Sequence, residues 1–250
     1  MEIKRDIYLN RLIVRKHNGF IKVITGIRRS GKSYLLNTLF YNHLVAEGVR
    51  EDHIIRFAFD SADDLIKIGE NPIVLDNERE NHKVDPTKFI NWLMPQIADA
   101  EMHYILLDEV QKLGAFESVL NGFLRKNNMD VFVTGSNSKF LSKDILTEFE
   151  GRGDEVHVYP VSFREYMEVF DGDKYEGWSS YVSFGGLPLT ITMATDEQRM
   201  EYLTSLFEET YIKDIIERNH IEKVQEINDL INILASGIGS LTNASKIKAT

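Results

Sequence analysis

The chain has 250 residues and is 43% hydrophobic, which is enough to bury one large core or two modest ones. Its formal net charge of −10 argues against a broadly basic nucleic-acid surface, although it leaves room for a local basic patch. The absence of cysteine excludes disulfides and zinc–thiolate sites and is typical of a cytoplasmic protein. No stretch reaches the roughly 18 uncharged apolar residues of a membrane helix, so we expect no membrane partner.

Strands alternate with helices through the first 159 residues. Short apolar runs predict five strands, at residues 20–25, 53–59, 104–107, 130–134 and 156–159. Helical spacing of apolar residues predicts helices at residues 35–44, 86–97, 116–126 and about 139–149. Asp85 is a predicted N-cap, whereas the polar residues 60–85 before it are predicted to be irregular. The alternation indicates an α/β fold, with a parallel sheet covered by helices on both faces.

The pattern changes after Pro160, and the rest of the chain is helical with no convincing strand. Ser162 and Glu165 have the spacing of a capping box at the start of one helix. Amphipathic helices are predicted over residues 196–218 and 227–235. We therefore expect three regions: an α/β domain at 1–159, a helical domain at 160–225, and the truncated start of a winged helix-turn-helix at 226–250.

Residues 26–33 read GIRRSGKS, a complete G-x-x-x-x-G-K-S between a predicted strand and a predicted helix. In such a loop the backbone N–H groups surround phosphate oxygens, the lysine contacts the β- and γ-phosphates, and the serine hydroxyl binds Mg²⁺. The positive end of the following helix adds to anion binding. A plain glycine turn is the structural alternative, but the strand before and the helix after favour a nucleotide site.

The predicted nucleotide-binding residues are consecutive: Gly26, Ile27, Arg28, Arg29, Ser30, Gly31, Lys32, Ser33 and Tyr34. Lys32 is also a predicted catalytic cation, and Ser33 is also a predicted magnesium ligand. Arg28 and Arg29 can contact either phosphate or an acidic neighbour, and the residues alone do not choose between these partners.

A second motif, YILLDE, occupies residues 104–109. Four apolar residues predict a buried strand, and two carboxylates follow at its carboxyl end, where open parallel sheets bind ligands. Asp108 is the predicted magnesium ligand, acting through a water, and Glu109 is predicted to polarise the attacking water. A solvated acidic turn is the alternative; a phosphate loop about seventy residues earlier favours the catalytic interpretation.

Two further candidates follow the fourth and precede the fifth predicted strand. Ser136 or Asn137 can bond the γ-phosphate or the water, or belong to an ordinary polar loop. Arg152 can reach a γ-phosphate in its own or a neighbouring subunit and stabilise transition-state charge. Alternatively, Arg152 is a surface arginine paired with a nearby acidic residue: Glu148, Glu150 or Asp154.

Other chemistries lack their motifs. The sequence has no H-E-x-x-H and no G-x-S-x-G. It also has no N-K-x-D or T-K-x-D to select guanine, so ATP is expected rather than GTP. The Asp–Glu pair, in place of a lone Asp, indicates water as the nucleophile and argues against a kinase.

Five stretches, in this order, resemble the AAA-like P-loop ATPases of bacteria and archaea: GIRRSGKS, YILLDEVQ, VFVTGSNS, GRGDEVHVYPVSFREY and FGGLP. The resemblance covers nearly the whole chain, and residues 160–165 and 185–188 are its more specific markers. It implies a sheet of order 5-1-4-3-2 and supports the roles given above to Lys32, Ser33, Asp108 and Glu109. It also puts Arg152 where such ATPases often carry an arginine finger.

In that family a helical domain of unknown function follows the ATPase core and ends in a winged helix. The resemblance implies that most of this winged helix, with any recognition helix, is missing here. Two functions are then open. One is an ATPase with Mg²⁺ that drives conformational work on a nucleic acid or protein. The other is a slow nucleotide-operated switch that gates a helical module for binding a partner or DNA. A homo-oligomer and a DNA or protein partner at the C-terminal region fit both.

Overall fold

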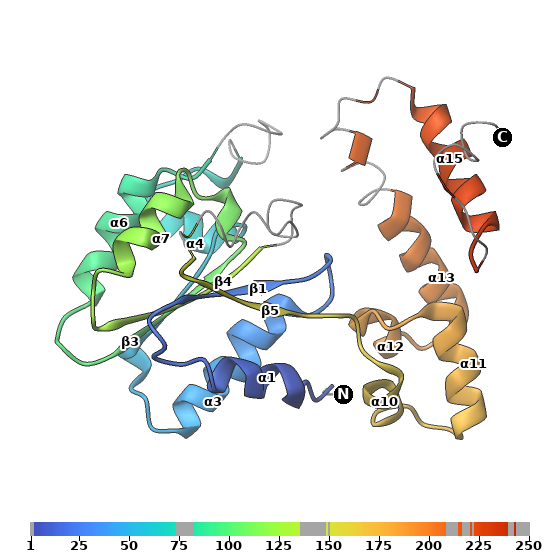
Figure 1. Ribbon diagram of the computed structural model, residues 1–250, viewed down its shortest axis with the longest axis horizontal. Helices are drawn as coiled ribbons and strands as arrows, with labels where there is room; N and C mark the ends of the chain where they lie inside the picture. The colour runs from blue at the N-terminus through green and yellow to red at the C-terminus, as the bar shows by residue number, and fades with distance from the viewer. Residues whose placement is uncertain are drawn as a thin grey trace. The chain divides into compact units, whose positions relative to one another are not determined.

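A computed structural model describes residues 3–73, 83–135, 149, 151–208, 215–216, 221, 223–239 and 243 (Figure 1). By its internal contacts the chain divides into two compact units, Met1–Thr192 and Met193–Thr250. The first unit contains the sheet. Within the described ranges of the second unit the elements are helical. No helix in the described part of the chain has the length and apolarity needed to cross a bilayer.

The sheet has five strands, all parallel, in the order β2-β3-β4-β1-β5. Their bounds are β1 Ile21–Thr25, β2 Ile54–Ala58, β3 His103–Asp108, β4 Met129–Thr134 and β5 Gly153–His157. Every residue of the three central strands, β1, β3 and β4, is buried, as expected for a parallel sheet covered on both faces. This confirms the predicted α/β fold class and the order 5-1-4-3-2, counted from the other edge of the sheet.

The fifth strand lies earlier than predicted. It was expected at residues 156–159, but Gly153 already pairs with Ile21, and the pairing runs to His157. The strand begins with polar residues, which an apolar pattern cannot detect. Besides the backbone ladder, the Thr25 hydroxyl of β1 bonds the side chains of Glu155 and His157. Val158 N continues the ladder with a 2.8 Å bond to Thr25 O, so the chain stays extended beyond the strand.

Two layers of helices cover the sheet (Figure 1). One face carries α1 Asp6–Ile13 and the continuous run α2 Lys32–Tyr34, η1 Leu35–Phe40 and α3 Tyr41–Ala46. The other face carries α4 Ala62–Lys67, α6 Pro86–Leu93 and α7 Phe116–Phe123. Alternate residues of β3 point to opposite layers: Ile105 belongs to the core under α6 and α7, and Leu106 to the core under α1 and η1.

Short 3-10 turns connect several elements: η2 Glu51–His53, η3 Met94–Gln96 and η4 Val110–Lys112. The predicted cap at Asp85 is confirmed, because its side chain accepts the Thr87 N–H at 2.7 Å. The prediction that residues 60–85 are irregular is wrong at their start, where α4 forms. Ser61 caps this helix and Leu65 is its one buried residue, so six residues with a single apolar anchor gave no periodic signal.

The remaining helices are α10 Phe163–Met167, α11 Lys174–Phe184, α12 Pro188–Thr192, α13 Asp196–Ser205 and α15 Val224–Ser236. The capping box of Ser162 and Glu165 is confirmed at the start of α10. By contacts, α10 to α12 belong to the same unit as the sheet. The boundary predicted at residue 160 stays a prediction. The helix predicted at residues 227–235 is confirmed within α15. Most of the helix predicted at residues 139–149, part of that predicted at 196–218, and most of residues 240–250 in the predicted winged helix-turn-helix region lie outside the described residues.

Candidate nucleotide site

The loop between β1 and α2 curves tightly at two glycines. Gly26 has φ of 144° and Gly31 has φ of 95°, both in the region that side chains disfavour. A Cβ at Gly26 would lie 2.2 Å from Val158 O, closer than any van der Waals contact. Glycine is therefore required at position 26, because Val158, in the segment that follows β5, packs directly against the loop.

Lys32 is buried at the base of this loop. Its Nζ donates to Gly26 O at 3.0 Å and to Ile27 O at 2.9 Å. Burial lowers the pKa of Lys32, and the negative charges of Glu109 and Asp108 oppose this shift. The lysine side chain is thus held inside the loop, within electrostatic reach of two carboxylates.

Asp108 ends β3 and is buried with three hydrogen-bond donors around its carboxylate. Asn37 Nδ2 donates to Oδ2 at 3.0 Å, Thr134 Oγ1 donates to Oδ1, and the Ser33 hydroxyl also bonds the side chain. Burial raises the pKa of Asp108, and the bonds from Thr134 and Ser33 counter that effect. The structure thus brings Ser33 and Asp108, the two predicted magnesium ligands, into direct contact.

Glu109 follows in a left-handed backbone conformation, with φ of 53°, which is uncommon for a residue with a side chain. Its N–H donates to Thr134 Oγ1 at 3.1 Å, and its carboxylate accepts a hydrogen bond from Gln111 Nε2. One hydroxyl, that of Thr134, therefore orients both acidic residues. This places Glu109 beside Asp108 but with its carboxylate engaged by an amide.

Three residues of this network were not singled out in the sequence: Asn37, Thr134 and Gln111. Asn37 comes four residues after Ser33 on the same helical run, so helical spacing was a usable signal. Thr134 ends β4, which lies beside β3, so strand order with the polar end of a strand was a second signal. Gln111 had no local signal, because only the turn of η4 brings its amide back to Glu109.

The other residues in and just after the loop differ in exposure. Four residues are exposed: Ile27, Arg28, Arg29 and Tyr34. The positive charge of Arg28 adds to the lowering of the Lys32 pKa. Ser30 is buried, and its Oγ has no hydrogen-bond partner among the described residues. Ser136 and Asn137, the candidates after β4, lie outside the described residues.

Arg152 lies at the opposite edge of the sheet from the phosphate loop. It precedes β5, and its carbonyl accepts the N–H of Ile21, the first residue of β1, at 2.9 Å. The loop follows the last residue of β1, so five strand residues, about 16 Å, separate the two. An arginine side chain does not span that distance. Asp154, one of its possible acidic partners, pairs instead with Arg15 at 2.8 Å.

Arg5, which the sequence did not single out, ties the loop to the first helix after the sheet. Its buried guanidinium donates to Ser30 O at 3.2 Å and to Tyr159 O at 2.6 Å, and Nε lies 3.2 Å from Glu165 Oε1. A Cβ at Gly31 would lie 3.7 Å from Pro188 Cγ. The stretch FGGLP therefore ends beside the phosphate loop, although about 155 residues of chain separate them.

Comparisons with known proteins agree with this arrangement. A family profile described as an AAA domain matches residues 18–167, and one described as a domain of unknown function (DUF8612) matches residues 175–250. The Walker-type ATPase PABY2304 of Pyrococcus abyssi has a similar structure, with a TM-score of 0.59 over 88% of this chain and 77% of that chain. Its sequence identity of 16% makes this a likeness of fold.

Two curated relatives are uncharacterized proteins. One, from Haemophilus influenzae, is 32% identical over 99% of this chain and 59% of its own length. The other, from Methanocaldococcus jannaschii, is 27% identical over 98% of this chain and 52% of its own length. The chain therefore spans between half and three fifths of the length of these relatives.

Proposed function

The chain belongs to the family of AAA domains, and from that premise we propose that it binds ATP with Mg²⁺ and hydrolyses ATP to ADP and phosphate. The observation that carries the proposal is the meeting of Lys32, Ser33 and Asp108 at the carboxyl edge of the sheet, with Glu109 beside them. The work that hydrolysis drives is a conformational change acting on a nucleic acid or protein partner.

The loop fits a triphosphate. Its glycine conformations bend the backbone around the Lys32 ammonium, whose hydrogen-bond acceptors among the described residues are the Gly26 and Ile27 carbonyls. Carbonyl oxygens are neutral acceptors, so charged phosphate oxygens would be stronger partners for this cation. The unpartnered Oγ of Ser30 is a further donor in the described part of the loop. Lys32 would hold the β- and γ-phosphates.

The residues beside the loop fit Mg²⁺, which prefers oxygen ligands. The Ser33 hydroxyl and the Asp108 carboxylate supply such oxygens and already touch each other. Asn37 and Thr134 hold the two carboxylate oxygens in place, so Asp108 would need little reorganisation to serve the ion directly or through a water. Bound Mg²⁺ supplies charge neutralisation on the phosphates.

Glu109 is the residue we assign to the attacking water. A carboxylate within hydrogen-bond reach of a water can polarise it and accept its proton. Substituting Glu109→Gln keeps the size of the side chain but removes the basic oxygen. We expect the variant to retain ATP binding while its single-turnover rate falls by at least about tenfold.

The matched control is Glu51→Gln, which changes an exposed carboxylate on η2 and should leave the rate unchanged. ATP affinity measured by calorimetry and hydrolysis measured by single-turnover assay separate the two roles. A Glu109→Gln protein that hydrolyses ATP at the wild-type rate would make Glu109 a structural neighbour of Asp108 and remove the assignment.

One observation favours the second function, a slow nucleotide-operated switch. The Glu109 carboxylate accepts a hydrogen bond from the buried Gln111 amide, which keeps it from acting fully as a base. In a switch, this state would last until a partner or nucleotide rearranges the η4 turn. The C-terminal region, matched to the domain of unknown function, is then the module that the nucleotide gates.

The variant Gln111→Met tests the switch, because methionine has a similar shape but cannot donate to Glu109. We expect its basal single-turnover rate to rise, by up to about tenfold for the loss of one charge-assisted hydrogen bond. The double variant with Glu109→Gln should lose that gain. A basal rate that stays level or falls in Gln111→Met would favour the energy-driven ATPase over the switch.

A further inference from the structure

A cluster of two histidines and an aspartate lies at the amino edge of the sheet, opposite the edge that carries the phosphate loop. His53 ends η2 directly before β2, His103 is the first residue of β3, and Asp99 lies in the segment leading to β3. One candidate ligand atom from each residue lies within 4.8 Å of those of the other two. Both histidines are buried and Asp99 is exposed, so the cluster opens to solvent on one side.

His103 presents an imidazole nitrogen that has no hydrogen-bond partner within the described part of the chain. Its Nδ1 lies 2.9 Å from Glu101 O. A carbonyl only accepts, so Nδ1 carries the proton and Nε2 carries the lone pair. That Nε2 is buried and has no hydrogen-bond partner among the described residues, with Asp99 Oδ1 at 4.0 Å. A backbone carbonyl behind Nδ1, with a free Nε2 in front, is the arrangement found for histidines that bind metals.

His53 differs in polarity from His103. Its Nε2 lies 3.2 Å from Asp99 Oδ2, and its Nδ1 lies 3.7 Å from Glu101 Oε2. A carboxylate oxygen only accepts, so this Nε2 carries a proton, which a bound metal ion would replace. Glu101 therefore stands behind both rings, with its carbonyl at one and its carboxylate at the other. The two rings stack at 4.3 Å between centroids with 23° between their planes. Both Nε2 atoms are thus directed to the side of the cluster where Asp99 lies.

From this geometry we propose that His53, Asp99 and His103 bind one divalent transition-metal ion of the zinc class. Two imidazole nitrogens with one carboxylate oxygen suit Zn²⁺, whereas Mg²⁺ and Ca²⁺ prefer oxygen ligands throughout. Ligand atoms around a tetrahedral zinc lie about 3.3 Å apart, given zinc–nitrogen bonds of about 2.0–2.1 Å. The 3.2 Å between His53 Nε2 and Asp99 Oδ2 already matches, whereas the 4.0 Å between His103 Nε2 and Asp99 Oδ1 would have to shorten by about 0.7 Å.

The charged side chains around the cluster are compatible with a bound cation. Arg50 Nη1 lies 3.7 Å from Asp99 Oδ2, and the same guanidinium also pairs with Asp52 at 2.5 Å. When a cation takes Asp99, Arg50 keeps Asp52 as its partner. The ion would join the start of β2 to the segment before β3, two parts of the chain about fifty residues apart. It would therefore oppose separation of β2, an edge strand, from the rest of the sheet.

The test is a calorimetric titration: Zn²⁺ alone is added to protein that has been treated with a chelator, with no nucleotide or Mg²⁺ present. We expect one ion per chain and a rise in melting temperature with zinc. Asp99→Asn keeps the shape of the exposed side chain but should weaken this binding by at least about tenfold. Asp52→Asn is the matched control: it removes the same charge beside the same arginine and should bind zinc like the wild type.

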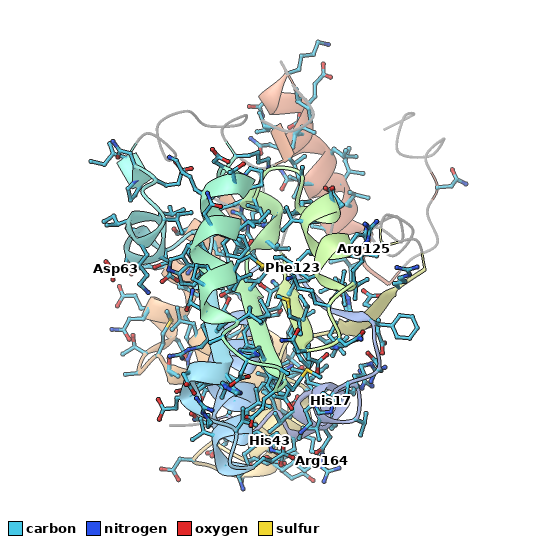
Figure 2. All side chains as sticks on the ribbon, turned by 90° about the vertical axis from the view of Figure 1, so that its left-hand side faces the viewer. His17, His43, Asp63, Phe123, Arg125 and Arg164 are labelled. Carbon is cyan, nitrogen blue, oxygen red and sulfur yellow. The ribbon has the colours of Figure 1, made fainter. Side chains whose placement is uncertain are left out.

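A second pair of variants tests the imidazoles. His53→Gln should weaken zinc binding as Asp99→Asn does. His43→Gln should not, because His43, labelled in Figure 2 on α3, faces the carboxylate of Glu47 at 3.1 Å and is not part of any three-ligand group found in the described ranges. Circular dichroism checks that each variant folds. No stoichiometric binding by the wild type, or equal affinity for Asp99→Asn and Asp52→Asn, would overturn the proposal and leave the stacked histidines as packing.

Discussion

A single hydroxyl links the two acidic residues of the candidate site. Thr134 Oγ1 donates to Asp108 and accepts the N–H of Glu109. Burying a carboxylate is costly unless donors surround it, and Asp108 receives donors from three different elements: η1, β4 and the start of α2. Its orientation is therefore a property of the folded sheet and is in place before any ligand arrives.

Lys32 gives the most direct test of nucleotide binding. Lys32→Ala removes the cation assigned to the β- and γ-phosphates, and we expect ATP affinity to fall by at least about a hundredfold, as for loss of a buried charge-assisted contact. Calorimetry with ATP and Mg²⁺ measures this change. Lys16→Ala, which removes a lysine paired with Glu47 away from the loop, is the control and should bind ATP normally. An unchanged affinity for ATP in a folded Lys32→Ala protein would rule out the proposed nucleotide site.

Strand β1 contains a charged residue in an otherwise apolar run. Lys22 is fully buried and pairs with Asp130 of β4, while its ammonium also lies 4.6 Å from the Phe132 ring centre. Burial lowers the pKa of Lys22, and Asp130 opposes that shift. The pair joins two neighbouring strands at the amino edge of the sheet. The strand was predictable from its apolar residues, but the partner of its lysine was not.

Breaking this pair from one side should destabilise the sheet. Lys22→Met leaves Asp130 buried with only the His17 N–H as a described donor, and we expect a loss of about 3 kcal/mol in the free energy of unfolding. Lys22→Met combined with Asp130→Asn removes both charges and should recover at least half of that loss. Urea denaturation measures each value.

The control for this cycle is Lys16→Met, which breaks an ion pair nearer the surface and should change stability by less than about 1 kcal/mol. If the double variant loses as much unfolding free energy as Lys22→Met and Asp130→Asn lose separately and added together, the two residues do not interact and the cost lies in packing alone.

We expect Arg152 to act in an assembly of several copies of the chain. At the amino edge of the sheet it lies far from the loop of its own chain, so we expect it to serve ATP bound by a neighbouring copy. An arginine supplied by a neighbour contributes on the order of a thousandfold in rate in other phosphoryl-transfer systems. Specific activity should then rise with protein concentration, and Arg152→Ala should bind ATP normally but hydrolyse it poorly.

Mixing variants makes this prediction sharper. Arg152→Ala and Lys32→Ala proteins, each inactive alone, should regain activity when combined, because each supplies what the other lacks. Arg125→Ala is the matched control: Arg125, labelled in Figure 2, is exposed and also precedes a strand, β4, at the same edge of the sheet. Activity that is flat with concentration, together with an inactive mixture, would exclude this role for Arg152.

Local chemistry is what the sequence determined. The phosphate loop at residues 26–33, the strand that ends at Asp108, and the caps at Asp85 and Ser162 all follow from neighbouring residues, so each was predictable. The α/β class followed from the alternation of strands and helices, and the strand order from the family resemblance. Short or polar elements were not predicted, as α4 and the start of β5 show, because an element with few buried residues gives little periodic signal in the sequence.

Only the tertiary structure decided which distant residues meet. Strand pairing puts Thr134 beside Asp108, the turn of η4 returns Gln111 to Glu109, and the N-terminal Arg5 reaches Ser30. The same pairing separates Arg152 from the phosphate loop and gathers the His53 cluster at the opposite edge. The physical reason is that these contacts depend on the order and register of strands, which long-range packing selects, whereas a motif depends only on the conformation of its own few residues.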